Sequence, residues 1–442
     1  MIHSVRNIRR RAEHETEVTV EMPENSLASL TQLISTDGAI QEENRQNSIR
    51  EVFHNLKHRR AVELTPSQQF GIYLHIPFCF HKCHYCDFYS IVDTKDRQRA
   101  FAERLEQEIR AAREWLAQPV QTIFVGGGTP TLLAADLWRN LLTTLADSLP
   151  LAPQLEFTVE ANPETVTAEL AGVLAAGGVN RVSIGAQSFD PAHLKTLERQ
   201  HEPANVARSM DRFRHAGIHD LNLDLIFGVP GQSLEDWRAD LESAIALKPT
   251  HLSCYGLTYE PNTALTRRKT MGRVTPIDDS IEADMYEHTI ARLSEAGYEH
   301  YEISAWARPG HRCQHNLLYW TNADWWPFGP SASGHLNGLR WKNVPRLTEY
   351  LDHGPLPRVQ DVEFVDPAAR SGEALMMGLR LRDGIPGERL ERILTEAPNV
   401  ASSRRAAIDR LVAQGSLEWR DGSLRLSDRG LLIADSVLVE LI

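Results

Sequence analysis

One stretch of the chain decides the fold: Y-L-H-I-P-F-C-F-H-K-C-H-Y-C-D-F, from Tyr73 to Phe88. Its apolar start reads as a β-strand and is followed directly by Cys79, Cys83 and Cys86, spaced C-x3-C-x2-C. In folds built from βα units, the chemistry is placed at the carboxyl ends of the strands. We therefore expect three thiols to converge at that end of a parallel sheet.

From Gly71 onward, short apolar runs rich in β-branched residues alternate with amphipathic helical stretches. This alternation is typical of successive βα units. The stretch from Arg97 to Leu116 has apolar residues at helical spacing, and Ser233 with Asp236 resembles a capping box. The pattern predicts an α/β fold with a partial (β/α)6 barrel. Its expected strands are Ile72 to Ile76, Thr122 to Val125, Glu156 to Glu160, Arg181 to Ile184, Asp220 to Phe227 and Leu252 to Thr258.

We expect four parts in the chain. Residues 1–68 hold a single aromatic residue, Phe53, among charged and amide side chains, which predicts a poorly ordered extension. The barrel is expected over 69–297, ending in a helix at about Ser280 to Ala296, and an aromatic-rich strand layer with a linker over 298–366. Residues 367–442 show two helical patterns, Ser371 to Leu381 and Ser402 to Gln414, and then two short strands. That order predicts a small C-terminal helical domain resembling a winged helix.

Composition limits the function classes. Of the 442 residues, 42% are hydrophobic and 24% are charged, as in an ordinary globular protein. The net charge of -12 argues against broad binding of nucleic acid or membrane surfaces, which depends on clustered cationic residues. No run approaches the roughly 18 to 20 apolar residues of a membrane span, and the arginines near the start precede no apolar segment. We expect a cytoplasmic protein with no nucleic-acid partner and no transmembrane segment.

The crowding of three of the five cysteines favours a metal site in a reducing compartment over disulfides. A structural zinc site would need a fourth ligand, for which only His81, His84 or Asp87 is at hand. A [4Fe-4S] cluster normally has four cysteine ligands, so three would leave one iron open to a small molecule. The surrounding βα pattern favours the cluster.

The cysteine stretch resembles the opening motif of radical S-adenosylmethionine (SAM) enzymes, and most of all the group formed by the coproporphyrinogen dehydrogenases and the HemW family. The resemblance runs from about Phe70 to Ile442. It implies that Cys79, Cys83 and Cys86 hold a [4Fe-4S] cluster whose open iron is chelated by the amino and carboxylate groups of SAM. It also implies a reductant that supplies one electron to cleave SAM.

The same resemblance implies which residues hold SAM. The stretch Gly126 to Pro130, G-G-G-T-P, is similar to the family's glycine motif for the SAM amino group, although such a turn alone is usually a tight connection. Polar residues near the ends of later strands match the family's SAM contacts, while each alone also reads as a cap or an ion-pair residue. Tyr73 precedes the cysteines and Tyr85 lies between Cys83 and Cys86, so each is expected either near the cluster or the adenine or as plain shielding. The expected SAM-site residues are Tyr73, Tyr85, Gly127, Gly128, Thr129, Glu160, Gln187, Arg199 and Asp224.

Two features indicate which family within this group the chain resembles more. The coproporphyrinogen dehydrogenases carry a fourth cysteine two residues after the third, where this chain has Phe88. The stretch His315 to Trp320 matches the H-N-x-x-Y-W motif associated with haem binding in the HemW family. His315 would then be an axial ligand of haem iron, with Cys313 as a competing thiolate. In the other interpretation, the His-Asn pair precedes an aromatic strand and satisfies buried backbone groups.

The resemblance therefore implies a haem chaperone that binds haem as cargo, delivers it to recipient haemoproteins, and carries a [4Fe-4S] cluster and SAM. The alternative is an oxygen-independent coproporphyrinogen III oxidase. A third candidate is a radical SAM enzyme that acts on a substrate unrelated to tetrapyrroles. No side chain is assigned a catalytic role at this stage, and a homodimer is left open.

Overall fold

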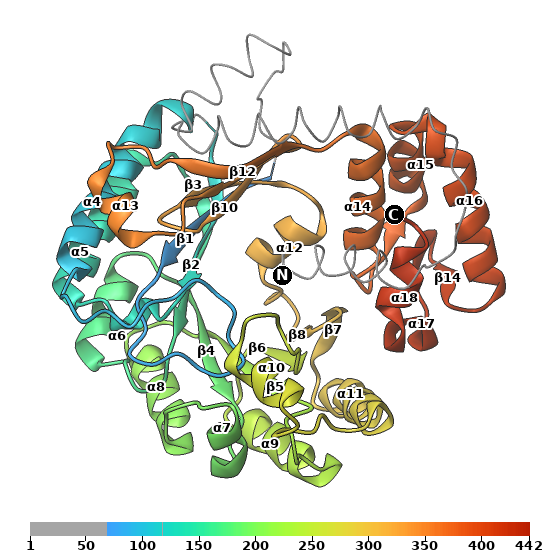
Figure 1. Cartoon of the computed structure of the whole chain (residues 1–442), viewed down its shortest axis with the longest axis horizontal. Helices are drawn as coiled ribbons and strands as arrows, with labels where there is room; N and C mark the ends of the chain where they lie inside the picture. The colour runs from blue at the N-terminus through green and yellow to red at the C-terminus, as the bar shows by residue number, and fades with distance from the viewer. Residues whose placement is uncertain (1–68, 117) are drawn as a thin grey trace.

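The computed structural model describes residues 69–116 and 118–442 (Figure 1). The extension expected over residues 1–68 lies outside the described residues. Within them, one curved sheet has twelve strands in the order β12-β11-β10-β9-β1-β2-β3-β4-β5-β6-β8-β7.

Six neighbouring parallel strands form the centre of this sheet, and each covers a predicted strand or most of it. The partial (β/α)6 barrel is confirmed, because sequence order and spatial order coincide from β1 to β6. The six strands are β1 (Phe70–Ile76), β2 (Val120–Gly127), β3 (Leu151–Ala161), β4 (Arg181–Gln187), β5 (Asp220–Phe227) and β6 (His251–Gly256).

Helices cover the outer face of these strands, as Figure 1 shows. The apolar stripe predicted after Arg97 is buried, with Phe101, Leu105 and Ile109 fully covered. The predicted capping box of Ser233 and Asp236 is also present. The helices of the barrel are α4 (Gln98–Ala112), α5 (Ala135–Ser148), α6 (Ala168–Ala176), α7 (Pro191–Thr196), α8 (Pro203–His215), α9 (Leu234–Ala246), α10 (Ala264–Thr270) and α11 (Asp279–Glu295), with short 3-10 turns at Arg113–Trp115 and Pro130–Leu132.

The segment 298–366 differs from the expected separate strand layer, because its strands extend the barrel sheet at both edges. β7 (Glu299–Glu302) and β8 (Ala305–Ala307) join β6. At the other edge β9 (Asp324–Phe328) pairs in parallel with β1, followed by three antiparallel strands. These are β10 (Ser333–Leu336), β11 (Leu339–Asn343) and β12 (Val359–Phe364), with α13 (Leu347–Asp352) between the last two.

Helix α12 (Gln314–Trp320) corrects one expectation, since strand had been expected here. The helix packs against β1 and β2 and projects toward the middle of the barrel in Figure 1. Its buried residues are His315, Leu318 and Trp320. The aromatic content had suggested strand, but the segment forms a helix where it packs against the barrel.

The C-terminal part has its own hydrophobic core, which includes Leu375, Met376 and Leu424. Its helices lie beside the barrel in Figure 1, and an antiparallel bridge between Glu302 and Leu381 joins the two parts. None of the helices in the described part of the chain has the length and apolar character needed to cross a membrane. The elements are α14 (Pro367–Gly378), β13 (Ile385–Pro386), α15 (Gly387–Thr395), α16 (Pro398–Ala413), β14 (Leu417–Arg420), β15 (Ser423–Leu426), α17 (Asp428–Leu432) and α18 (Ala434–Val439), with the strands in the order β13-β15-β14.

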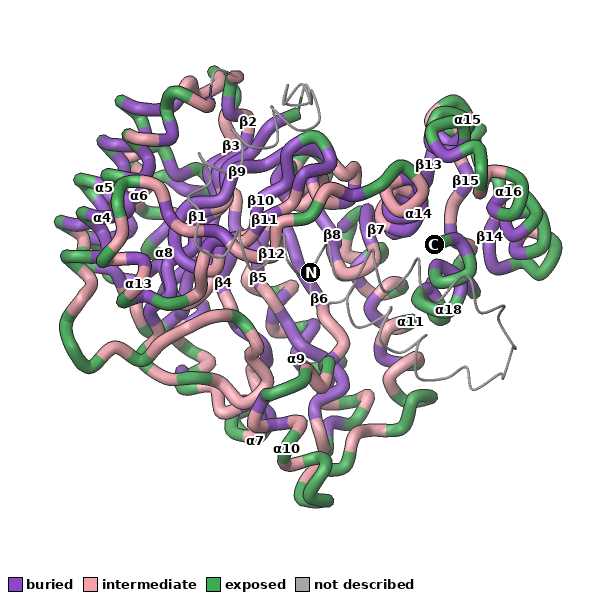
Figure 2. The backbone as a smooth tube through the Cα atoms, turned by 45° about the horizontal axis from the view of Figure 1, so that its top comes forward, coloured by how far each residue is buried: buried purple, intermediate pink, exposed green. Residues whose placement is uncertain are grey.

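The inside of the barrel is accessible rather than packed solid. Side chains alternate between the two faces of a strand, and the central strands consist mostly of buried residues (Figure 2). On each of the six central strands, a residue of the inner face stays half-buried. These residues are Tyr73, Phe124, Glu160, Gly185, Asp224 and Tyr255. Solvent therefore reaches the inner face of the barrel at each of the six central strands.

Candidate functional site

The three cysteines lie in the loop between β1 and α4, and all three are half-buried free thiols. Backbone hydrogen bonds hold this loop against the barrel. The Cys79 amide donates to the carbonyl of Ile91 at 2.9 Å, and the His84 amide donates to the carbonyl of Leu197 at 3.2 Å. The loop thus fixes its thiols at the carboxyl end of the sheet, as the sequence predicted.

The glycine stretch after β2 supports the cysteine loop directly. The amides of Gly128 and Thr129 donate to the carbonyls of Ile76 and Phe78 at 2.8 and 2.7 Å. A Cβ on Gly128 would lie 2.6 Å from the Phe78 carbonyl oxygen, which is closer than real contacts allow. The Thr129 hydroxyl lies 3.6 Å from Cys79 Sγ. This stretch therefore holds the cysteine loop in place, a role that sequence reasoning missed.

Gly127 has φ +108°, a left-handed conformation that favours glycine. Its amide donates to Glu160 Oε2 at 3.2 Å, so the end of β2 and the inner face of β3 meet at one carboxyl group. Burial and the negative charge of Asp224 together raise the pKa of Glu160 to about 8. A cationic ligand beside Glu160, or one rich in hydroxyl groups, would therefore favour the ionised form of its carboxyl group.

Asp224 belongs to a polar network across β4, β5 and β6. Its carboxylate accepts hydrogen bonds from Ser183 Oγ at 2.7 Å and from Asn222 Nδ2 at 2.8 Å. Burial raises the pKa of Asp224, and these donors oppose that rise. Sequence reasoning missed Ser183 and Asn222, although polar residues that alternate with apolar ones in adjacent strands were a signal of a polar inner face.

Arg199 connects the end of β4 with the cysteine loop. Its Nη2 donates to the Gly185 carbonyl at 2.9 Å, and its Nη1 lies 3.8 Å from Cys83 Sγ. The Nε of Arg199 is buried and has no hydrogen-bond partner. Gln187 ends β4 with φ +62°, a conformation uncommon for a residue other than glycine. An unpaired guanidinium N–H beside the thiols fits a bound carboxylate.

The donor set therefore suits an iron–sulfur cluster with SAM. Burial raises the pKa of Cys86 to about 12 and also raises that of Cys79, so both thiols keep their protons until a metal ion displaces them. His84, one of the candidate zinc ligands, instead has its Nδ1 3.2 Å from Arg268 Nη1 and 3.8 Å from Glu198 Oε2.

The two tyrosines of the expected site are separated. Tyr85 packs against an apolar cluster that contains Leu197 and Leu265, which matches the shielding role. Tyr73 lies inside the barrel, where its ring stacks on Phe124 and its hydroxyl is 3.2 Å from His75 Nδ1. Tyr73 thus lines the inner face of β1, whereas Tyr85 packs beside the cysteine loop.

His315 is 0% exposed and lies deeper in the molecule than the cysteine loop. Its Nδ1 is 2.8 Å from Thr122 Oγ1, its Nε2 is 3.0 Å from the Tyr319 hydroxyl, and its ring stacks on Phe124. Burial lowers the pKa of His315 to about 3, so the imidazole is neutral. Cys313 is also buried, with its Sγ 3.5 Å from Glu156 Oε1. Both imidazole nitrogens have partners in this arrangement, so either nitrogen would bind an iron only after its hydrogen bond breaks.

Comparisons with known proteins agree with this fold. Residues 73–244 match the radical SAM superfamily, and residues 365–433 match the HemN C-terminal domain. A solved structure described as the coproporphyrinogen III oxidase HemN from Escherichia coli, a radical SAM enzyme, superposes with a TM-score of 0.74. It is 20% identical and covers 86% of this chain and 91% of its own. At that identity the likeness establishes the fold alone.

Several other proteins are more similar to this chain in sequence than that solved structure is. The heme chaperone HemW of Mycobacterium tuberculosis is 38% identical over 381 residues, which are 84% of this chain and 95% of the relative. The heme chaperone HemW of Escherichia coli is 36% identical over 387 residues, which are 85% of this chain and 98% of the relative. The heme chaperone HemW of Bacillus subtilis is 33% identical over 371 residues, which are 83% of this chain and 97% of the relative. With nearly the full length of these relatives matched, the chain belongs to the heme chaperone HemW family of the radical SAM superfamily.

Proposed function

We propose that this protein binds haem and delivers it to recipient haemoproteins in the cytoplasm. The observation that carries the proposal is the match to heme chaperones over 95% and 98% of their length. The residue at the fourth-cysteine position supports it. Phe88 is 53% exposed and offers no metal ligand, so the cysteine loop differs there from that of the coproporphyrinogen dehydrogenases.

The cofactors in this proposal are a [4Fe-4S] cluster on Cys79, Cys83 and Cys86 and SAM beside it. When bound, the reduced cluster supplies the electron that cleaves SAM. The chain's own groups position the ligand. Arg199 offers its unpaired Nε to a carboxylate, and the buried carboxyl groups of Glu160 and Asp224 offer acceptors to hydroxyl or ammonium groups.

The remaining members of the expected SAM site have supporting positions in this proposal. Gly127, Gly128 and Thr129 hold the end of β2 against the cysteine loop and Glu160. Gln187 ends β4 beside Gly185, the residue that accepts a hydrogen bond from Arg199. The proposal also includes a soluble reductant for the cluster, and a homodimer is left to measurement.

His315 is proposed as the haem ligand after a movement of α12. Its neutral imidazole is a suitable donor to iron, and Nε2 becomes available when the hydrogen bond to Tyr319 breaks. The same movement exposes the ring of Tyr319 and that of the buried Trp320, which can pack on a porphyrin face.

A haem titration of the anaerobically prepared, cluster-loaded protein tests this proposal. We expect saturable binding with a Soret band, and a shifted band with weaker binding in His315→Gln. The control is His215→Gln, because His215 is exposed at the end of α8, one of the helices outside the barrel. Saturable binding that His315→Gln leaves unchanged would reject the ligand assignment alone.

A parallel turnover assay decides between chaperone and enzyme. The cluster-loaded protein receives SAM, dithionite and coproporphyrinogen III, and decarboxylated porphyrinogen and 5'-deoxyadenosine are quantified. We expect no decarboxylated product. Product would identify an oxidase and overturn the proposal. Absence of both product and haem binding would instead point to a radical SAM enzyme with an unrelated substrate.

A further inference from the structure

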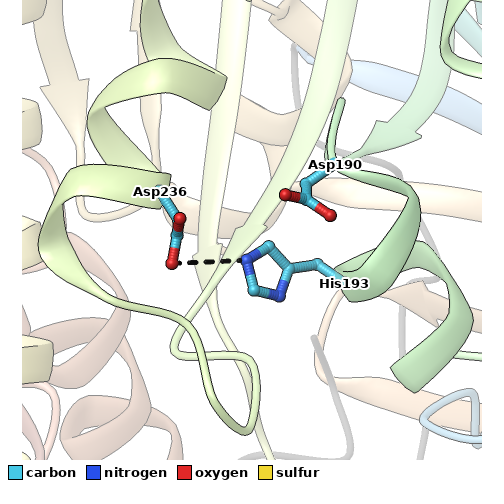
Figure 3. Close-up of side chains that lie close together, drawn as sticks. All are labelled: Asp190, His193 and Asp236. Carbon is cyan, nitrogen blue, oxygen red and sulfur yellow. Dashed lines mark ion pairs between the residues drawn. The ribbon is translucent and has the colours of Figure 1, made fainter.

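A second group of metal-ligand side chains lies outside the barrel, between α7 and α9 (Figure 3). Asp190 is the N-cap residue of α7, His193 lies in that helix, and Asp236 lies in the first turn of α9. One ligand atom from each residue lies within 4.8 Å of the other two. The two helices follow neighbouring strands, β4 and β5, so the barrel topology brings the three side chains together.

His193 provides an independent sign of a ligand. The residue is 7% exposed, and its Nε2 is buried without a hydrogen-bond partner. That atom faces Asp236, whose Oδ2 is 3.7 Å away, too far for a hydrogen bond. In Figure 3 the carboxyl group of Asp190 lies above the imidazole ring, and that of Asp236 lies to its left at the other end of the dashed ion-pair line. A buried imidazole nitrogen with no hydrogen-bond partner, close to two carboxylates, is better satisfied by a cation than by the long ion pair to Asp236 alone.

Hydrogen bonds orient both carboxylates. Asp190 Oδ1 accepts from the amide of Ala192 at 2.6 Å, and Asp236 Oδ2 accepts from the amide and hydroxyl of Ser233 at 2.8 and 2.7 Å. Metal ligands are commonly held by such a second set of bonds, which fix their direction before the ion arrives. Because these bonds already fix the two carboxyl groups beside His193, binding an ion would cost little further side-chain entropy.

The chain that leads to Asp190 is also fixed from α9. Asp240 accepts from Ser188 Oγ at 2.7 Å and from the Phe189 amide at 2.6 Å. This segment starts after Gln187, and α7 continues toward Arg199, whose amide donates to the Leu194 carbonyl at 2.8 Å. A cation bound between α7 and α9 would therefore hold in place the segment that carries Gln187 and Arg199.

We propose that Asp190, His193 and Asp236 form a binding site for a divalent transition metal ion, with zinc as the best-suited ion and water in the remaining position. One imidazole with two carboxylates is a ligand set that zinc accepts. In a tetrahedral zinc site, neighbouring ligand atoms are about 3.3 Å apart. The separation of 3.7 Å between His193 and Asp236 closes to that value with a small side-chain rotation. The ion joins α7 to α9 and has no part in the cluster chemistry.

The test uses the full chain with its cluster in place, so that the three cysteines are occupied. The protein is equilibrated with zinc chloride and passed over a chelating resin, and zinc and iron per chain are measured by mass spectrometry. X-ray absorption at the zinc edge then identifies the ligands. We expect one zinc per chain with nitrogen and oxygen ligands at about 2.0 to 2.1 Å. Sulfur ligands at about 2.3 Å would place the zinc on cysteines and overturn the proposal.

Asp190→Asn is the decisive variant, because asparagine also caps a helix but carries no charge. We expect it to lower zinc retention at least tenfold while iron content stays normal. The matched control is Asp278→Asn. Asp278 caps α11 by accepting a hydrogen bond from the Ser280 amide, and it is not one of the three proposed zinc ligands. If Asp190→Asn also loses iron, His193→Gln decides with the same readout. A wild-type protein that retains no zinc, or variants that retain as much as wild type, would refute the site.

Discussion

Thr122 and His315 share a buried hydrogen bond of 2.8 Å between Oγ1 and Nδ1, although 193 residues separate them in the chain. Thr122 lies on β2 and His315 on α12, so this bond fastens the helix to the inner face of the barrel. The other ring nitrogen bonds to Tyr319 within the same helix. The imidazole therefore links a barrel strand to the segment that we propose for haem binding.

Replacing Thr122 with valine should destabilise the fold. The substitution keeps the shape but leaves His315 Nδ1 buried without a partner, which costs about 1 to 3 kcal/mol. Chemical denaturation measures the change, and Thr122→Ser, which keeps the hydroxyl, should retain most of the stability. If the valine variant were as stable as the serine variant, the bond would have no part in holding α12.

Gly128→Ala should reduce the cluster content of the protein. The added Cβ would lie 2.6 Å from the Phe78 carbonyl oxygen, so the end of β2 and the start of the cysteine loop must separate. Iron per chain after anaerobic reconstitution is the measurement. Gly172→Ala is the matched control, because a Cβ there meets nothing within 4 Å and the residue lies in α6. Alanine suits a helix better than glycine by about 1 kcal/mol, so this control should fold at least as well as wild type.

Arg199→Gln should weaken SAM binding to the cluster-loaded protein. The proposed contact is a charge-assisted hydrogen bond, and its loss is worth about 1.5 to 3 kcal/mol, or roughly a 10- to 100-fold rise in Kd. Isothermal titration with SAM measures it. Arg199→Lys keeps the charge but loses the planar fork, so its Kd should lie between the other two. Equal Kd values for all three proteins would exclude Arg199 from the SAM site.

Much of the fold could be predicted because each barrel strand is a short apolar run, and β5 begins and ends at the predicted residues, Asp220 and Phe227. The extension of the sheet could not. β9 pairs with β1 although Asp324 and Phe70 are far apart in sequence, and no local pattern specifies which edge strand a distant segment joins. The helix at His315 was missed because its aromatic residues have strand propensity, while packing against β1 and β2 decides the conformation.

The candidate site, like the fold, could be predicted only in part from the sequence. The cysteine spacing could be read from the sequence itself, and the resemblance to radical SAM enzymes pointed to Glu160, Gln187 and Asp224 near the ends of their strands, where the carboxyl ends of parallel strands meet. The burial of His315 and its bonds to Thr122 and Tyr319 could not, since they depend on where α12 packs. The cluster of Asp190, His193 and Asp236 was missed for the same reason, as Asp236 alone reads as part of a capping box.

Glu160→Gln should change how stability depends on pH. The pKa of Glu160 in the folded protein is about 8, raised by burial and by Asp224, against an ordinary value of 4.5. Between these two pH values the folded state holds a proton that the unfolded state has released, so stability falls as pH rises from about 4.5 to 8. Glutamine has the same shape and no charge to bury. The variant should therefore match wild type near pH 5 and exceed its stability near pH 8.

Urea denaturation of both proteins without SAM, at several pH values from 5 to 8, measures this difference. Glu108 and Glu302 are also buried, with pKa values raised to about 7, but they remain in both proteins and cancel in the comparison. Glu235→Gln removes an exposed carboxyl from α9 and should leave the pH profile of wild type unchanged. A gap between wild type and Glu160→Gln that stays constant with pH would mean that Glu160 is ionised throughout, as an ordinary accepting carboxylate. A gap that widens toward pH 8 would establish the protonated carboxyl as the resting form of the barrel interior.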